Sequence, residues 1–299
     1  MCGIVGIYYK NKDLNKHLGT MLASMLVQMS ERGPDSAGVA IYRNPVDPPR
    51  TKVTLYAGDD DYDWKRFGRL LSKVFGADFE IEVRVSHAVL TTTAALPELR
   101  AWLDSNYPEL QIMSAGSTIE IYKEKGAPRE FVERFNLQDF QGSHALGHTR
   151  MATESAVTTA HSHPFSTGLD LCLVHNGSLS NHNRLREKLQ AEGIEFQTDN
   201  DSEVAAGYLM WQLHQGASLE QALNCAIRDL DGFYTFAVGT RKGFAVLRDP
   251  IACKPAVMAE NDDWVAMASE FRAIAQLPGV EHATVWEPEP ATVYSWGEE

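Results

Sequence analysis

The chain has 299 residues, 44% of them apolar, and a formal net charge of −13. Nucleic acids and anionic membranes are bound through basic surfaces, so this charge argues against both kinds of partner. No apolar run approaches the length that crosses a bilayer, and no positively charged leader precedes an apolar stretch. We therefore expect a cytoplasmic protein with no membrane partner and no nucleic-acid partner.

The four cysteines, Cys2, Cys172, Cys225 and Cys253, are widely separated and form no CxxC pair. This spacing argues against a disulfide framework and against an Fe–S cluster held by this chain alone. Because Cys172, Cys225 and Cys253 have apolar neighbours, we expect them to be buried, inert thiols in a reducing compartment. We also predict no metal site.

The first fifty residues predict a strand, a helix and a second strand. Residues 2–9 form an apolar stretch typical of a buried strand. Apolar residues then recur at helical spacing between residues 13 and 31, and Gly33 with Pro34 ends that helix. A short strand over 39–42 and a proline-rich loop follow.

Residues 51–140 differ in character and predict a small α/β segment inserted in the main domain, with boundaries uncertain by several residues. Such an insertion either docks a partner or only decorates the fold, and the sequence leaves both open. The expected elements are a helix over 64–74, a half-exposed strand over 79–85, a helix over 97–105 and a strand over 117–122.

The last part of the chain returns to helices followed by strands. Because strands gather at both ends of the chain with helices between them, we expect sheets stacked inside helical layers rather than an alternating parallel sheet. The expected elements are a strand over 171–175, helices over 183–192, 202–214 and 218–230 (the last with a capping box of Ser218 and Gln221), and strands over 233–240, 244–248, 264–267 and 291–296.

Cys2 is the first candidate for chemistry. Methionine aminopeptidase normally removes Met1 when the next side chain is small, which would leave a thiol and a free α-amine on one residue. The amine could then take the proton of the thiol, so one residue would hold nucleophile and base. If Met1 is retained, the nitrogen of Cys2 lies in a peptide bond and cannot act as base.

Four further polar clusters accompany Cys2. Each has a structural explanation when taken alone, because Asn-Gly is a common turn and Asp or Asn before a helix is a common N-cap. Agreement of all of them in this order is far less frequent by chance. The clusters are residues 32–38 (RGPDSAG), 147–153 (GHTRMAT), 175–177 (HNG) and 199–203 (DNDSE).

Together these motifs resemble the glutaminase domain of class II glutamine amidotransferases, an N-terminal-nucleophile hydrolase family. The resemblance covers residues 1–50 and about 140–299, and it includes the segment HSHPF, Arg248-Asp249-Pro250 with Lys254-Pro255, and Ser269-Glu270. It implies an α/β (α+β) fold in which residues 1–299 form one four-layer αββα sandwich, with the probable insertion at about 51–140.

The resemblance also implies a set of roles. Cys2 would attack the side-chain amide of L-glutamine, form a thioester and release glutamate and ammonia. Asn176 and Gly177 would stabilise the oxyanion. Arg150 would bind the substrate carboxylate and Asp201 its ammonium group, since glutamine is a zwitterion.

Other residues of the matched motifs have less direct expected roles. Arg32 would hold the loop near the nucleophile. His148, Thr149 and His163 would line the pocket, whereas His175 is better explained as a structural histidine.

The family's second, ammonia-using domain has no room in this chain, so we expect a stand-alone glutaminase-type subunit. It is similar to such subunits of glutamate-synthase-type systems, including N-methylglutamate synthase. This likeness implies a hetero-oligomer with a partner synthase, no cofactor in this chain, and FMN or Fe–S in the partner. Two alternatives stay open: a catalytically silent subunit that binds glutamine or glutamate or serves as a scaffold, and an N-terminal-cysteine hydrolase of other acyl amides.

Overall fold

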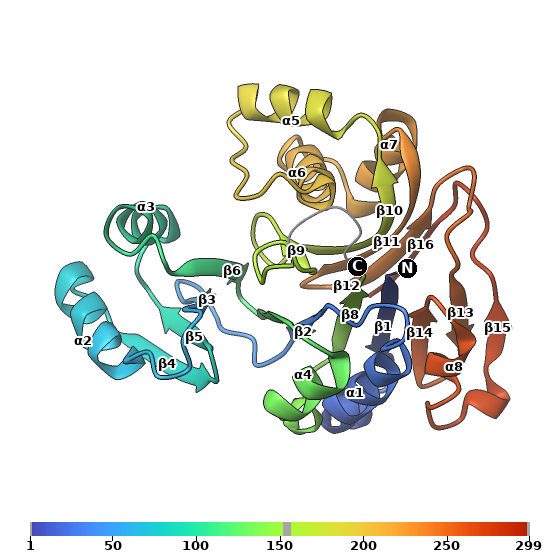
Figure 1. Cartoon of the computed structure of the whole chain (residues 1–299), viewed down its shortest axis with the longest axis horizontal. Coiled ribbons are helices and arrows are strands. Elements are labelled where there is room, and N and C mark those ends of the chain that lie inside the picture. Colours follow the sequence, from blue (N-terminus) through green and yellow to red (C-terminus); the bar gives the residue numbers. More distant parts are fainter. Residues whose placement is uncertain (1, 152–156, 298–299) are drawn as a thin grey trace.

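Two antiparallel sheets form the centre of the computed structural model, which describes residues 2–151 and 157–297 (Figure 1). In spatial order the seven-stranded sheet contains β15 (Thr284–Trp286), β13 (Val257–Glu260), β14 (Trp264–Ala268), β1 (Gly3–Tyr9), β8 (His144–Arg150), β2 (Ser36–Tyr42) and β7 (Ile119–Lys125). The five-stranded sheet contains β16 (Val293–Gly297), β12 (Gly243–Arg248), β11 (Gly232–Thr240), β10 (Cys172–Leu179) and β9 (Phe165–Ser166).

The two sheets pack face to face through apolar side chains. Successive side chains of a strand point to opposite faces, so Ile4 of β1 packs between the sheets while Val5 and Ile7 face the outside of the seven-stranded sheet. Val174 and Phe244 of the five-stranded sheet belong to the same buried apolar cluster as Ile4. Strands with apolar residues on both faces therefore read as continuous apolar runs.

Helices cover both outer faces. The seven-stranded sheet is covered by α1 (Leu18–Gln28), α4 (Pro128–Arg134) and α8 (Phe271–Ile274), and the five-stranded sheet by α5 (His182–Ala191), α6 (Asp201–His214) and α7 (Leu219–Asp229) (Figure 1). Short 3-10 helices lie at η1 (Lys12–His17), η2 (Leu137–Asp139) and η3 (Val280–His282). This arrangement confirms the four-layer αββα sandwich, and the capping box of Ser218 and Gln221 is present on α7.

A third sheet stands beside the sandwich. Its strands, in order, are β4 (Phe79–Arg84), β5 (His87–Thr92), β3 (Thr51–Tyr56) and β6 (Gln111–Gly116), accompanied by α2 (Trp64–Phe75) and α3 (Leu96–Asn106). This unit, residues 51–116, has its own apolar core, which includes Leu55, Trp64, Leu71 and Leu99.

The separate sheet is shorter than the inserted segment expected at about 51–140. β7 pairs with β2 in the seven-stranded sheet, and α4 packs on the main core, because Ile119, Ile121 and Phe131 are buried there. β4 shows the alternation that predicted a strand. β3 was not predicted although Lys52-Val53-Thr54-Leu55 also alternates, and its polar side chains are buried rather than exposed. β5 is buried along most of its length and has no such alternation.

Buried charges hold the 51–116 unit against the sandwich. The carboxylate of Glu120 on β7 accepts hydrogen bonds from Lys52 of β3 at 2.5 Å and from Arg43 at 3.1 Å. Arg43 also donates to Glu82 of β4 at 3.0 Å. Glu120 and Lys52 are almost fully buried. Breaking such a pair would leave an unpaired charge in the interior, so the network fixes how the unit sits.

Asp170 fixes the point where the chain returns from this unit to the sandwich. Its carboxylate accepts main-chain N–H groups of Ser117 at 2.8 Å, Thr118 at 2.9 Å and Ile119 at 3.1 Å. The sequence analysis did not single out Asp170, because its partners lie more than fifty residues away.

The environments of the cysteines differ from one another. Cys172 is buried as expected, but Cys225 is only partly buried and Cys253 is exposed. The prediction for Cys253 was wrong because this residue lies in the loop after β12. In a loop, apolar residues next to it in the sequence do not mean that it is buried. No helix among residues 2–151 and 157–297 is both long and apolar enough to cross a membrane.

Candidate active site

Cys2 lies immediately before β1, at the end of the sheet where β8 also ends. The antiparallel register pairs Gly3 with Thr149, so Arg150 stands opposite Cys2 one step further along. The Sγ atom of Cys2 is 3.9 Å from the main-chain oxygen of Met151. Met1, Ala152 and Thr153 lie outside the described residues.

Two side chains from distant parts of the chain meet at the carbonyl oxygen of Cys2. Arg32 donates to it through Nε at 3.0 Å, and Asn176 donates to it through Nδ2 at 3.2 Å. Arg32 also donates through Nη1 to Glu270 at 2.6 Å. Both side chains are largely buried, so they hold the backbone of Cys2 in one position.

The turn that carries Arg32 packs directly on the end of β8. A Cβ atom on Gly33 would lie 2.3 Å from the carbonyl carbon of Thr149, so only glycine allows this approach. The hydroxyl of Thr149, which is fully buried, donates to the main-chain oxygen of Met29 at 3.0 Å. Thr149 thus ties β8 to the end of α1 rather than presenting its hydroxyl to solvent.

Asn176 and Gly177 lie on β10, opposite Thr235 and Tyr234 of β11. Gly177 has φ +148°, and a Cβ atom there would lie 2.0 Å from the main-chain oxygen of Phe233. Its position is exposed whereas Asn176 is buried. A larger residue at 177 would push β10 and β11 apart at the point where the Asn176 amide meets Cys2.

Asp201 is the first residue of α6, which Asn200 caps by accepting from the N–H of Ser202 at 2.8 Å. The carboxylate of Asp201 accepts the N–H of Leu179 at 2.9 Å and lies 3.8 Å from Nδ1 of His175. These contacts bring Asp201 to the end of β10, so a residue far along the chain joins Asn176 and Gly177.

Three buried histidines lie behind this strand end. The rings of His148 and His163 stack with centroids 4.0 Å apart, and His148 donates through Nε2 to the main-chain oxygen of His175 at 3.0 Å. Burial lowers the pKa of His148 to about 3 and that of His163 well below its usual range. Burial also lowers the pKa of His175, although Asp201 opposes this shift. All three are therefore neutral at neutral pH.

Ser202 joins two of these histidines to Asp201. Its Oγ lies 2.8 Å from Nε2 of His163 and 2.8 Å from Nδ1 of His175, and it donates to Asp201 at 3.2 Å. A hydroxyl has a single proton, so Ser202 can donate to only one of these three groups at a time. The sequence analysis missed this role, since a serine after an N-cap has no distinctive signal.

Glu203, the last residue of the cluster 199–203, orders the loop before α6. Its carboxylate accepts the main-chain N–H groups of Gln197 and Thr198, each at 2.7 Å. This ordering of the loop before α6 helps to position Asp201.

Arg150, at the end of β8, is largely buried, with only 6% of its surface exposed.

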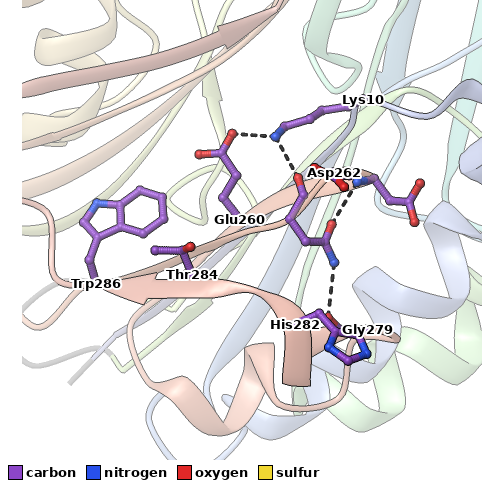
Figure 2. Close-up of a pocket in the computed structure, with 9 residues that line it drawn as sticks. Lys10, Glu260, Asp262, Gly279, His282, Thr284 and Trp286 are labelled. Atoms are coloured by element: carbon purple, nitrogen blue, oxygen red, sulfur yellow. Dashed lines mark hydrogen bonds and ion pairs between the residues drawn. The ribbon is translucent and has the colours of Figure 1, made fainter.

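A hollow of about 610 Å³ on another face lies away from this site (Figure 2). Lys10, Glu260 and Trp286 are among its lining residues. Lys10 follows β1 whereas Cys2 precedes it, and the seven residues of β1 span about 23 Å. The hollow is therefore separate from the residues gathered around Cys2.

Comparisons with known proteins show which family this chain is similar to. Residues 148–276 match the family described as "Glutamine amidotransferase domain". The chain is 54% identical over 297 residues to "Glutamine amidotransferase-like protein GlxB" of Rhizobium meliloti (strain 1021), covering 99% of this chain and 98% of that protein.

A second relative and a solved structure extend the comparison. Identity is 34% over 170 residues to "Glutamine--fructose-6-phosphate aminotransferase [isomerizing]" of Xylella fastidiosa (strain 9a5c), covering 56% of this chain and 27% of that protein. The glutamine phosphoribosylpyrophosphate amidotransferase structure from B. subtilis matches with a TM-score of 0.60 and 20% identity, over 99% of this chain and 49% of that chain. The structural match supports the fold alone.

Proposed function

The chain belongs to the class II glutamine amidotransferase family, a family of enzymes, and we propose that it hydrolyses L-glutamine through Cys2 and supplies ammonia to a partner synthase subunit. One observation carries the proposal. Arg32 and Asn176, from separate motifs, both donate to the carbonyl oxygen of Cys2. Residue 2 is thus held as a reactive residue would be, at the meeting point of the two sheets.

In the proposed reaction, Sγ of Cys2 attacks the side-chain carbonyl carbon of glutamine. The C–N bond breaks, ammonia departs with a proton taken from the thiol, and a γ-glutamyl thioester remains. Water then hydrolyses the thioester to glutamate and regenerates the thiol. The α-amine of a processed chain serves as the proton carrier.

The oxyanion of each tetrahedral intermediate needs donors. The amide of Asn176 has two N–H groups, and one of them already donates to Cys2. The second N–H and the main-chain N–H of Gly177 are the proposed oxyanion donors. Loss of one such donor typically raises the barrier by about 3 kcal/mol, about a hundredfold in rate.

The zwitterion of glutamine needs one cation and one anion. Arg150 stands opposite Cys2 in the register of β1 and β8, which supports it as partner of the substrate carboxylate. Asp201 stands at the end of β10, which supports it as partner of the ammonium. His148, His163 and Thr149 are assigned to positioning, because they are buried and engaged with other groups.

The ammonia-accepting partner is proposed to be a synthase of the glutamate-synthase or N-methylglutamate-synthase type, carrying any FMN or Fe–S group itself. Ammonia released into water is protonated and ceases to be a nucleophile, so a separate glutaminase needs an acceptor site close by.

The test combines intact mass with glutamine hydrolysis. Protein from its native cell should be lighter than the full sequence by one methionine, and it should release glutamate from glutamine, whereas Cys2→Ala should not. Equal turnover by wild type and Cys2→Ala overturns the proposal. Retained Met1 with glutamine binding and no turnover supports the silent subunit instead.

Arg150→Ala separates glutamine hydrolysis from hydrolysis of other amides. It should raise KM for glutamine while leaving any hydrolysis of a simple acyl amide unchanged. Faster wild-type hydrolysis of an apolar acyl amide than of glutamine would favour the alternative hydrolase.

A further inference from the structure

The outer face of α2 carries four cations in a chain that is otherwise strongly acidic. Lys65, Arg66, Arg69 and Lys73 are all exposed, and the helix contains no acidic residue. Its other face, with Trp64, Phe67 and Leu71, is buried on the four-stranded sheet. Figure 1 shows α2 on the side of the 51–116 unit that points away from the sandwich.

These four cations have no ion-pair partner among the described residues, although acids are close in sequence. Glu80 and Glu82 of β4 are paired with Arg50 at 2.6 Å and with Arg84 at 2.8 Å. Asp60 is paired with Arg134 at 2.7 Å. These three carboxylates are thus paired with cations outside α2, and Asp63 caps the helix by accepting the main-chain N–H of Arg66 at 2.9 Å.

This placement is unfavourable for the helix itself. Lys65 and Arg69, and likewise Arg69 and Lys73, are four residues apart, where like charges destabilise a helix. Lys65 also lies in the first turn, which the helix dipole makes unfavourable for a cation. Lys73, in the last turn, is favoured by the same dipole. Helix electrostatics therefore gives no reason for Lys65 and Arg69, whereas an anionic ligand would.

A hollow of about 440 Å³ adjoins the cations, between α2 and β4. It is lined by Lys65, Gly68, Arg69, Ser72, Phe79 and Ile81. Two of these residues are cations and two are large and apolar, so the hollow suits an apolar side chain flanked by carboxylates. Val74 and Val83, on the same two elements, are 44% and 48% exposed.

We propose that the exposed face of α2, with the hollow beside β4, docks an acidic segment of a partner polypeptide that inserts one apolar side chain. Lys65 and Lys73 are about 12 Å apart along the helix, a length that a few residues of peptide can match. The net charge of −13 repels extended polyanions such as nucleic acid, so a short acidic segment is favoured. Identifying this partner as the ammonia acceptor rests on the proposed function. The proposal that α2 is a docking surface does not depend on it.

The orientation of this surface is fixed by the buried charges that hold the unit to the sandwich. Lys52 and Arg43 meet on Glu120, and Arg43 reaches β4 through Glu82. A partner seated on α2 is therefore held in a defined position relative to Cys2, as transfer of ammonia between two proteins requires.

The test measures fluorescence anisotropy of a labelled peptide of about twelve residues, rich in glutamate with a central Leu-Phe pair, binding to the full chain. Wild type should bind saturably and more weakly as salt rises. The double variant Lys65→Glu with Arg69→Glu should weaken binding at least about tenfold. The matched control, Arg241→Glu with Lys242→Glu at the exposed β11–β12 turn, makes the same charge change and should retain the affinity.

Two further arms test the hollow. Ser72→Trp keeps the charge but fills the hollow, so it should weaken binding several-fold. A peptide with Ser-Ser in place of Leu-Phe should bind wild type correspondingly less well.

Several outcomes overturn the inference: no binding by wild type, equal loss in the control double variant, or no effect of Ser72→Trp. Tighter binding of a DNA duplex or of phosphatidylserine vesicles through the same cations overturns the assignment to a polypeptide. Glutamine hydrolysis by the Lys65 and Arg69 double variant should equal that of wild type. A failed docking surface is therefore distinguishable from a failed Cys2 mechanism.

Discussion

Arg32 holds the carbonyl oxygen of Cys2 through Nε at 3.0 Å and is itself held by Glu270 through Nη1 at 2.6 Å. The carboxylate of Glu270 also pairs with Arg272, which reaches Glu31 at 2.9 Å on the surface. A series of ion pairs thus runs from Cys2 to the surface. Mutation of Glu270 tests the buried end of this series, and mutation of Glu31 tests its exposed end.

Glu270→Gln should lower kcat/KM for glutamine. The variant keeps the shape of the side chain but removes the charge that orients Arg32, and a hydrogen bond to a charged group contributes about 1.5–3 kcal/mol. That range corresponds to about a ten- to hundredfold loss. Steady-state glutaminase kinetics provides the measurement. Glu31→Gln, on a side chain that is 84% exposed, is the control and should behave as wild type. Equal effects of both variants would contradict a positioning role for Glu270.

Gly177→Ala should reduce both stability and glutaminase activity. A methyl group there meets the oxygen of Phe233 at 2.0 Å, so β10 and β11 must separate beside Asn176. Gly193→Ala is the matched control, since Gly193 has φ +84° but no atom within 4 Å of the added Cβ. The control should lose only about 1 kcal/mol to backbone strain and keep its activity. Urea unfolding and glutamate release measure the two effects, and a loss no larger than that of the control would refute the close approach.

Asp170→Asn should destabilise the fold by about 2–4 kcal/mol. One oxygen that accepts main-chain N–H groups becomes an amide donor facing them. Asp170 has φ +53°, which asparagine tolerates, so backbone strain does not confuse the result. Denaturant unfolding gives the value. Asp231→Asn, at an exposed carboxylate that accepts from Ser180, should change the free energy by less than about 0.5 kcal/mol.

Acid should destabilise the protein through its buried histidines. Burial lowers the pKa of His87 from 6.5 to about 3, with Lys123 and Arg134 adding to the shift. Between these values the unfolded chain binds a proton that the folded chain excludes. Stability is therefore retained above about pH 6.5 and falls toward pH 3, by up to about 1.4 kcal/mol per pH unit for each such histidine. His144 and His148 shift in the same direction.

His87→Phe tests this sign. The ring packs against Tyr122 and Phe135, and its Nε2 has no hydrogen-bond partner among the described residues. Phenylalanine keeps this packing and removes one hydrogen bond, between Nδ1 and Oγ of Ser86 at 3.1 Å, which lowers stability at every pH but does not change the slope. Plots of unfolding free energy against pH should become shallower by about one proton below pH 6. His282→Phe, at a side chain that is 82% exposed, should leave the slope unchanged. An unchanged slope in His87→Phe would show that this histidine does not contribute.

Much of the secondary structure follows from local patterns. The helical spacing of apolar residues and the capping residues predicted helices at α1, α2, α6 and α7. The alternation in β4 predicted a half-exposed strand that the structure confirms. β5 was not predicted because a strand buried on both faces loses alternation, and β3 was not predicted although its short sequence alternates. The residues around Cys2 were predicted through motifs, but Glu270 as partner of Arg32 and Ser202 as the junction of two histidines were not.

The amino-acid sequence alone determined most of the helices and that Cys2, Arg32 and Asn176 belong to motifs. Each of these properties depends on neighbours within a few residues. The sequence did not predict α4 or α8, and it began the first helix near residue 13, where the structure has a 3-10 helix before α1 starts at Leu18. Only the tertiary structure decided that β7 belongs to the main sheet, that Glu120 neutralises Lys52 and Arg43, and that the cations of α2 stay unpaired. Pairing of this kind joins residues tens to hundreds of positions apart, and its free energy depends on burial and geometry that arise only when the sheets assemble.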